Sequence, residues 1–123
     1  MSVKSVMIID DSEMDHFLAK YMIEEYDPSI KIIQAYDGQE ALEILKNLSS
    51  QPDVIFLDIN MPRMNGHTFL EVYSNWEGHS ESVIMLTSSN QAQDKEKSLA
   101  YQCVKKYCVK PITRSHLESF ISM

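Results

Sequence analysis

The sequence predicts an α/β fold in which helices cover both faces of a doubly wound parallel sheet, within one domain of 123 residues. Five short apolar runs recur at steps of 24, 24, 28 and 24 residues, counted between the run centres Ile8, Ile32, Phe56, Ile84 and Cys108. The runs are continuous rather than alternating, which is typical of parallel strands buried on both faces. Segments of helical periodicity lie between them, as crossover connections require.

The apolar runs mark the five expected strands. They are Val6–Ile9, Ile32–Ile33, Val54–Leu57, Val83–Leu86 and Tyr107–Val109. Each run is bounded by polar, Gly or Pro residues, so the strands are expected to be short.

The first two connections predict helices with one buried face. In the first, the i, i+3, i+4, i+7, i+8 pattern predicts that five residues face the core, and the helix should end before Pro28. These five residues are Met14, Phe17, Leu18, Tyr21 and Met22. The second helix follows the turn at Asp37-Gly38, and its apolar residues are Ala41, Leu42, Leu45 and Leu48.

Three more helices complete the pattern. The third carries Phe69, Val72, Tyr73 and Trp76, with Asn65 as its N-cap and an end near Gly78. The fourth spans the polar segment 90–102 and is expected to be weakly amphipathic. The last carries Leu117, Phe120 and Ile121, and Thr113 is its expected cap.

Composition and charge exclude several classes of protein. The net charge is −7, with 18 acids against 11 bases, which argues against direct nucleic-acid binding. No apolar run approaches the roughly 20 residues of a membrane span, so no membrane insertion and a cytoplasmic location are expected. Cys103 and Cys108 lack a second pair that would make a zinc site, and buried thiols are the expected state.

Polar side chains follow four of the five strands. Asp10 and Asp11 follow the first strand, Asp58 the third, Thr87 the fourth and Lys110 the fifth. Any one of them alone has a plain structural explanation, such as a helix start, a cap or a solvated lysine at a turn. Because ligands of doubly wound folds bind at the carboxyl ends of the strands, one shared site explains all five residues together.

The residue types of this set predict phosphoryl-transfer chemistry. Three neighbouring carboxylates repel one another, and a divalent cation removes that cost. Oxygen ligands suit Mg²⁺, which usually keeps several waters. A carboxylate can act as the nucleophile and form an aspartyl phosphate. A lysine, a hydroxyl and the metal can together balance the charge on the transferred group.

At these residues the chain resembles the receiver domains of bacterial two-component response regulators, the CheY-like family. The matching pieces are IIDDS, DVIFLDINMPRMNG, IMLTSS and YCVKP, in order, and the resemblance covers nearly all of residues 1–123. It implies a single receiver domain with a flavodoxin-like (βα)5 fold and the strand order 2-1-3-4-5.

The resemblance also implies a role for each acid. Asp58 matches the phosphoacceptor, which also contacts the metal. Asp11 matches the direct Mg²⁺ ligand, and Asp10 its neighbour, which acts through a metal-bound water. Asn60 matches the residue whose backbone carbonyl completes the protein's share of the metal shell.

The remaining matches concern the switch. Thr87 matches the hydroxyl that moves towards the phosphoryl group, and Lys110 the lysine that pairs with that group. Tyr107 matches the aromatic switch residue that turns inward when Thr87 shifts. The bond between Lys110 and Pro111 is typically cis in the family.

These matches predict a phosphorylation-operated signalling switch rather than a classical enzyme, although the domain would catalyse its own phosphorylation and dephosphorylation. Its expected partner is a histidine kinase or a histidine phosphotransfer protein. The downstream target and the oligomeric state stay open. So do two alternatives, a receiver-fold binding module that no longer responds to phosphate and a receiver fragment of a larger regulator with an output domain. A haloacid-dehalogenase-type phosphatase is disfavoured because Asn60 stands where that class has its second acid.

Overall fold

Five parallel strands form one sheet in a computed structural model that describes residues 3–121. The strands are β1 (Ser5–Ile9), β2 (Lys31–Ala35), β3 (Val54–Leu57), β4 (Val83–Thr87) and β5 (Val104–Val109). Their order is β2-β1-β3-β4-β5, and every neighbouring pair is parallel. The predicted α/β class and the flavodoxin-like strand order are both confirmed.

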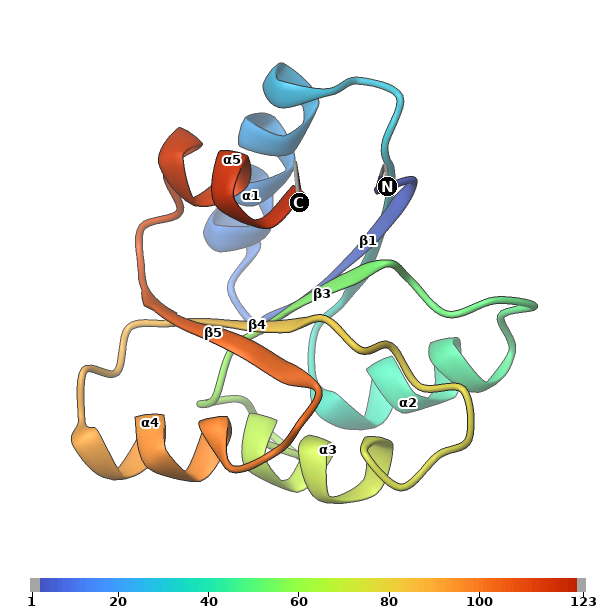
Figure 1. Cartoon of the computed structure of the whole chain (residues 1–123), viewed down its shortest axis with the longest axis vertical. Helices are drawn as coiled ribbons and strands as arrows, with labels where there is room; N and C mark the ends of the chain where they lie inside the picture. The colour runs from blue at the N-terminus through green and yellow to red at the C-terminus, as the bar shows by residue number, and fades with distance from the viewer. Residues whose placement is uncertain (1–2, 122–123) are drawn as a thin grey trace.

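Five helices connect or follow the strands. They are α1 (Glu13–Tyr26), α2 (Gly38–Lys46), α3 (Gly66–Tyr73), α4 (Ala92–Leu99) and α5 (Arg114–Ile121). Figure 1 shows α1 and α5 on one face of the sheet and α2, α3 and α4 on the other. Among the helices of residues 3–121, none has the combination of length and apolar character that crossing a membrane requires.

Successive residues of the central strands supply two separate cores. In β1, Val6 and Ile8 contribute to the core under α1 and α5, whereas Met7 and Ile9 contribute to the core under α2, α3 and α4. The strands β3 and β4 alternate in the same way. Because side chains of a strand alternate between faces, a strand covered on both faces must be apolar throughout. This explains the continuous apolar runs.

The edge strands are longer than predicted. β5 begins at Val104 rather than Tyr107, and its first residues include the exposed Lys105 and Lys106. β2 extends over Lys31–Ala35 and has only one fully buried residue. An edge strand needs fewer apolar side chains, so the apolar run underestimates its length.

The predicted helix caps are confirmed. The side chain of Asn65 accepts a hydrogen bond from the amide of Thr68 at 2.9 Å, at the start of α3. The hydroxyl of Thr113 accepts from the amide of His116 at 3.1 Å, directly before α5. Helix α1 ends at Tyr26, before Pro28 as predicted. Helices α3 and α4 are shorter than expected. Helix α3 ends at residue 73 rather than near residue 78, and α4 covers residues 92–99 of the expected segment 90–102.

The predicted buried face of α1 is wrong. Four of its five apolar residues are exposed, at 65% for Met14, 66% for Phe17, 41% for Leu18 and 53% for Tyr21, and Met22 is partly buried. The face that packs on the sheet carries His16, Ala19 and Ile23 instead. These three residues also have helical spacing, but a pattern of apolar residues overlooks a histidine. His16 can take a core position because its ring nitrogens have hydrogen-bond partners.

Candidate functional site

The acids that follow β1 and β3 lie together at the carboxyl end of the sheet. The amide of Asp58 donates to the carbonyl of Ile9 at 2.9 Å, and the amide of Asp10 donates to the carbonyl of Ala35 at 3.1 Å. The first bond places Asp58 beside the end of β1, where Asp10 follows, and the second holds Asp10 to β2. One oxygen from each of Asp10, Asp11 and Asp58 lies within 4.8 Å of the others. The structure therefore gathers all three predicted acids.

Backbone amides hold two of these carboxylates in place. The Oδ1 atom of Asp10 accepts from the amide of Ser12 at 2.9 Å, and Oδ1 of Asp58 accepts from the amide of Ile59 at 2.7 Å. Asp10 and Asp58 are buried, whereas Asp11 is exposed. Since one oxygen of each buried carboxylate is fixed by the backbone, the Oδ2 atoms of both remain for other partners.

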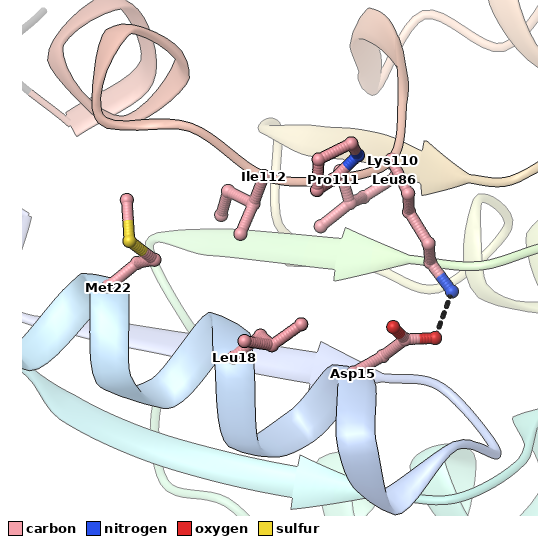
Figure 2. A pocket seen from close by; sticks show the side chains of 7 residues that line it. All are labelled: Asp15, Leu18, Met22, Leu86, Lys110, Pro111 and Ile112. Atoms are coloured by element: carbon pink, nitrogen blue, oxygen red, sulfur yellow. Dashed lines mark hydrogen bonds and ion pairs between the residues drawn. The ribbon is translucent and has the colours of Figure 1, made fainter.

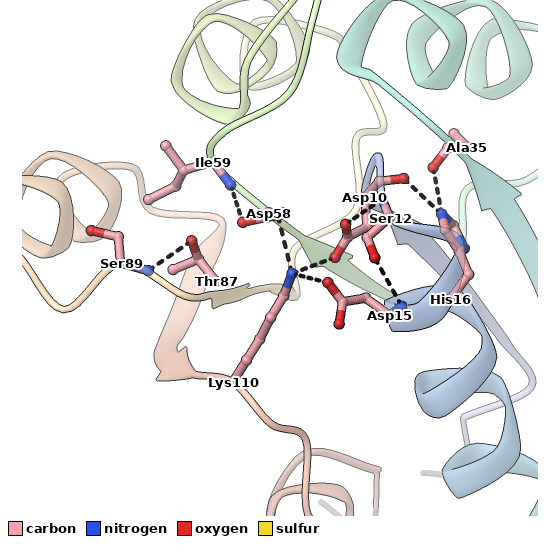
Figure 3. Close-up of polar contacts among 10 residues, drawn as sticks. All are labelled: Asp10, Ser12, Asp15, His16, Ala35, Asp58, Ile59, Thr87, Ser89 and Lys110. Atoms are coloured by element: carbon pink, nitrogen blue, oxygen red, sulfur yellow. Dashed lines mark hydrogen bonds and ion pairs between the residues drawn. The ribbon is translucent and has the colours of Figure 1, made fainter.

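Lys110 reaches these free oxygens from the end of β5. Figure 3 shows its Nζ atom in contact with three carboxylates. The distances are 2.8 Å to Oδ2 of Asp10, 3.1 Å to Oδ2 of Asp58 and 2.7 Å to Oδ2 of Asp15. The amide of Lys110 donates to the carbonyl of Thr87 at 2.8 Å, which anchors the residue to β4. The peptide bond between Lys110 and Pro111 is cis.

Burial and charge act in opposite directions on this cluster. Burial lowers the pKa of Lys110, but the hydrogen bonds to Asp10 and Asp15 and the charge of Asp58 outweigh it, so the pKa is raised overall. Burial raises the pKa of Asp10, and its hydrogen bonds to Lys110 and Ser12 only partly offset this. The lysine is therefore a firmly charged partner of the acids.

Thr87 and Tyr107 are joined through Ser89. Thr87 is fully buried, and its Oγ1 accepts from the amide of Ser89 at 3.3 Å. The hydroxyl of the half-buried Tyr107 donates to the carbonyl of Ser89 at 2.9 Å. The two residues expected to form the switch thus contact the same short loop, which connects β4 to α4.

A second polar chain ties this loop to the neighbouring helices. The hydroxyl of Ser89 donates to Asp94 of α4 at 2.5 Å, and Nε2 of His67 of α3 lies 3.1 Å from the same carboxylate. These two hydrogen bonds lower the pKa of Asp94. Asp94 and His67 were not among the predicted residues, because each looks like an ordinary helix residue in the sequence.

The segment after β3 packs closely against Asp58. A Cβ atom on Gly66 would lie 2.3 Å from the carbonyl oxygen of Asp58, so no larger residue fits there without movement. The amide of Gly66 donates to the carbonyl of Ile59 at 2.8 Å. Between them, Asn60 is exposed, and Arg63 has a φ of 61° and an ion pair to Asp37 at 2.8 Å. The loop that contains Pro62 and Gly66 thus packs against the backbone of Asp58 and restricts its position.

Two residues of α1 complete the site and were missed from the sequence. Asp15 binds Lys110, and His16 lies below the acids with Nε2 at 2.8 Å from the carbonyl of Asp10 and 3.0 Å from that of Ala35. Gln34 contacts the other ring nitrogen of His16 at 3.1 Å. The sequence could have indicated both residues by their position, because they lie in the first turns of a helix that begins directly after Asp10 and Asp11.

The donor set fits Mg²⁺. Three carboxylates offer oxygen ligands within a small space, and an exposed Asp11 leaves room for the waters that Mg²⁺ retains. Two of these acids also contact the Lys110 ammonium, with which a bound cation would compete.

Comparison with known proteins assigns the family. The profile of the response regulator receiver domain matches residues 6–122. This chain belongs to that family. Among curated relatives, it is 34% identical over 113 residues to protein PilG of Pseudomonas aeruginosa, covering 91% of this chain and 80% of that protein. The structure of a two-component response regulator from Cytophaga hutchinsonii is 27% identical, with a TM-score of 0.86 and coverage of 99% of this chain and 96% of that one.

Other relatives of this receiver domain are much longer proteins. The chain is 27% identical to the sensor histidine kinase CheAY of Helicobacter pylori and spans 14% of that protein's length. It spans 27% and 20% of two protein-glutamate methylesterases/protein-glutamine glutaminases. Receiver domains of this family therefore occur both in proteins of similar length and within larger ones.

Proposed function

We propose that this receiver domain is a phosphorylation-operated switch in which Asp58 accepts a phosphoryl group from the phosphohistidine of a histidine kinase or phosphotransfer protein. The observation that carries the proposal is that the buried Asp58 carboxylate contacts the Lys110 ammonium and lies within 4.8 Å of the acid pair Asp10 and Asp11. A nucleophile, a fixed cation and a metal-binding acid pair are the groups that phosphoryl transfer requires.

In the proposed step, a carboxylate oxygen of Asp58 attacks phosphorus and forms a new P–O bond. The bond between phosphorus and the donor imidazole nitrogen breaks, and its electron pair leaves on that nitrogen. Lys110, whose Nζ is 3.1 Å from Asp58, is close enough to bind a phosphoryl oxygen. Mg²⁺, when held by Asp11, Asp58 and the carbonyl of Asn60, with Asp10 acting through a water, supplies further charge neutralisation.

Phosphorylation would be read out through the loop between β4 and α4. The added group carries a charge of about −1.5 to −2 and new acceptor oxygens, to which the hydroxyl of Thr87 can donate. Because Thr87 and Tyr107 both contact Ser89, a movement of Thr87 would change the position of the tyrosine. The proposed output is a changed surface around α4 and β5, with a changed affinity for a downstream protein.

The family and the charge of the chain also suggest where the domain acts and what kind of partner it has. We infer that residues 1–123 form a single receiver domain that acts in the cytoplasm, with a protein as its phosphodonor. The net charge of −7 does not suit direct binding to nucleic acid.

The test is intact-protein mass spectrometry after incubation with acetyl phosphate, with and without Mg²⁺. We expect one phosphoryl adduct on the wild type that requires Mg²⁺, and none on Asp58→Ala. Asp27→Asn is the matched control, since Asp27 bonds to Ser29 at the other end of α1, and it should be phosphorylated normally. An unmodified wild type would favour a binding module that does not respond to phosphate, and an undiminished adduct on Asp58→Ala would exclude Asp58 as the acceptor.

A further inference from the structure

Lys110 binds a third carboxylate, Asp15, which has no part in the roles described above. The distance from Nζ to Oδ2 of Asp15 is 2.7 Å, the shortest of the three contacts that this ammonium makes with acids. We propose that Asp15 is a positioning residue that retains the Lys110 ammonium beside the site when Mg²⁺ binds Asp58 directly and Asp10 through a water. The inference rests on the proposed function, because it presupposes Mg²⁺ binding by these acids.

The two buried acids have few free oxygen positions. In both, Oδ1 is bound by a backbone amide and Oδ2 by Lys110. Each oxygen keeps a second lone pair, but a cation that binds at Oδ2 competes with the ammonium for the same atom. Two positive charges at the same oxygens repel each other strongly in a buried site. Displacement of Lys110 from Asp10 and Asp58 is the expected result.

Asp15 offers the displaced lysine a place to remain. It lies in the first turn of α1, where its amide donates to the capping hydroxyl of Ser12 at 3.2 Å, so its backbone position is fixed. It lies outside the set of acids that could jointly hold a metal. Its side chain is 32% exposed, against 5% for Asp10 and 7% for Asp58. Asp15 can thus hold the ammonium without blocking the metal ligands.

The surroundings strengthen this contact. Figure 2 shows the ion pair of Lys110 and Asp15 at one end of a hollow between α1 and the segment after β5. Apolar side chains line the rest of the hollow, namely Leu18, Met22, Leu86, Pro111 and Ile112. Apolar walls keep water away from one side of the ion pair, and a lower local dielectric makes its Coulomb attraction larger.

The loss of Asp15 should lower the affinity for Mg²⁺. Without the metal, Lys110 shares its charge among three acids, so Asp15 contributes only part of its stabilisation. With the metal in place, Asp15 becomes the main partner of the ammonium. Loss of Asp15 therefore disfavours the metal-bound state more than the metal-free state. Mg²⁺ should bind more weakly, because the lysine then competes harder for Asp10 and Asp58.

Calorimetric titration with Mg²⁺ tests this inference without requiring phosphorylation. We expect Asp15→Asn to weaken Mg²⁺ binding by about fivefold, in line with the modest strength of a partly exposed ion pair. Asp15→Glu keeps the charge and should restore most of the affinity. Glu13→Gln is the matched control, since Glu13 lies in the same helical turn but bonds to the hydroxyl of Tyr36 at 2.7 Å, and its affinity should stay within twofold of the wild type. Circular dichroism of each variant confirms that it is folded.

A double-mutant cycle with Lys110→Gln distinguishes an effect of Asp15 that acts through Lys110 from a direct effect of its negative charge on Mg²⁺. If Asp15 acts through Lys110, Asp15→Asn should change the Mg²⁺ affinity by less than about twofold in the Lys110→Gln background. An equal loss in both backgrounds, an equal loss in Glu13→Gln, or an unchanged affinity in Asp15→Asn would overturn the inference and leave the proposed function standing. A wild type that binds no Mg²⁺ would overturn both.

Discussion

The buried carboxylates Asp10 and Asp58 both have partners from neighbouring segments of the fold. Asp58 ends a fully apolar strand, and its carboxylate is compensated by the amide of Ile59 and by Lys110. A buried carboxylate without such partners would cost several kcal/mol. The strand and the loop that contains Gly66 therefore hold this carboxylate at a fixed position.

Tyr73 gives a prediction at the same scale. It is fully buried, its hydroxyl donates to Gln51 and accepts from the amide of Ser80, and burial raises its pKa from 10.0 to about 12. Above pH 10 the unfolded chain loses this proton while the native protein keeps it, so native stability falls as the pH rises towards 12. Through this group alone, the free energy of unfolding should drop by about 1 kcal/mol between pH 9 and pH 11.

Urea unfolding at the two pH values measures this effect. Tyr73→Phe cannot ionise, so its loss between pH 9 and pH 11 should be smaller than that of the wild type by about that amount. Equal losses in the two proteins would contradict the prediction. Tyr73→Phe also loses the two hydrogen bonds of the Tyr73 hydroxyl. That cost is the same at both pH values, so it cancels when the free energies of unfolding at pH 9 and pH 11 are subtracted for each protein.

At the scale of elements, α1 departs most from what its sequence pattern indicates. The helix turns Ala19 and Ile23 towards the sheet and leaves Met14 and Phe17 in solvent. The buried His16 fixes this rotation, because its ring contacts the carbonyls at the ends of β1 and β2. The same rotation directs Asp15 towards Lys110, so the position of a site residue depends on a hydrogen-bonded histidine.

Two substitutions in α1 test this rotation. Ile23→Ala should lower the free energy of unfolding by about 2–4 kcal/mol, because it opens a cavity in a fully buried position. Phe17→Ala removes a larger side chain, yet it should change stability by less than about 0.5 kcal/mol, because that side chain is 66% exposed. Urea denaturation gives both values. A larger loss for Phe17→Ala than for Ile23→Ala would mean that the opposite face is buried.

At the scale of the whole molecule, the two cores share one sheet. Every residue of β1, β3 and β4 that lies before the site contributes to one core or the other, with the exception of Ser5. Neither core can come apart without loss of the strands that support the other. We therefore expect one cooperative unfolding transition.

Two probes test this cooperativity. Trp76 packs against the core under α2, α3 and α4, so its fluorescence reports on one face, whereas far-ultraviolet circular dichroism reports on all helices. The two urea transitions should coincide in midpoint and slope. Separate midpoints would show that the faces unfold independently.

The sequence was most informative where physical constraints act on neighbouring residues. Continuous apolar runs predict strands buried on both faces, and polar residues at their carboxyl ends identify Asp10, Asp11, Asp58, Thr87 and Lys110 as a group. The strand order came from the family resemblance, since spacing alone does not determine which strands are neighbours. The roles of Asp15, Asp94 and His16 depend on helix rotation and on contacts distant in sequence, which apolar periodicity does not encode.

Asp58 is central to the proposed switch, because it is the residue that takes the phosphoryl group. Borohydride reduction of the phosphorylated protein converts an aspartyl phosphate to homoserine, and peptide mass spectrometry then locates the converted residue. After incubation with Mg²⁺ and acetyl phosphate, we expect homoserine at position 58 and at no other aspartate. Homoserine at another position, or phosphorylated protein without any homoserine, would contradict this expectation.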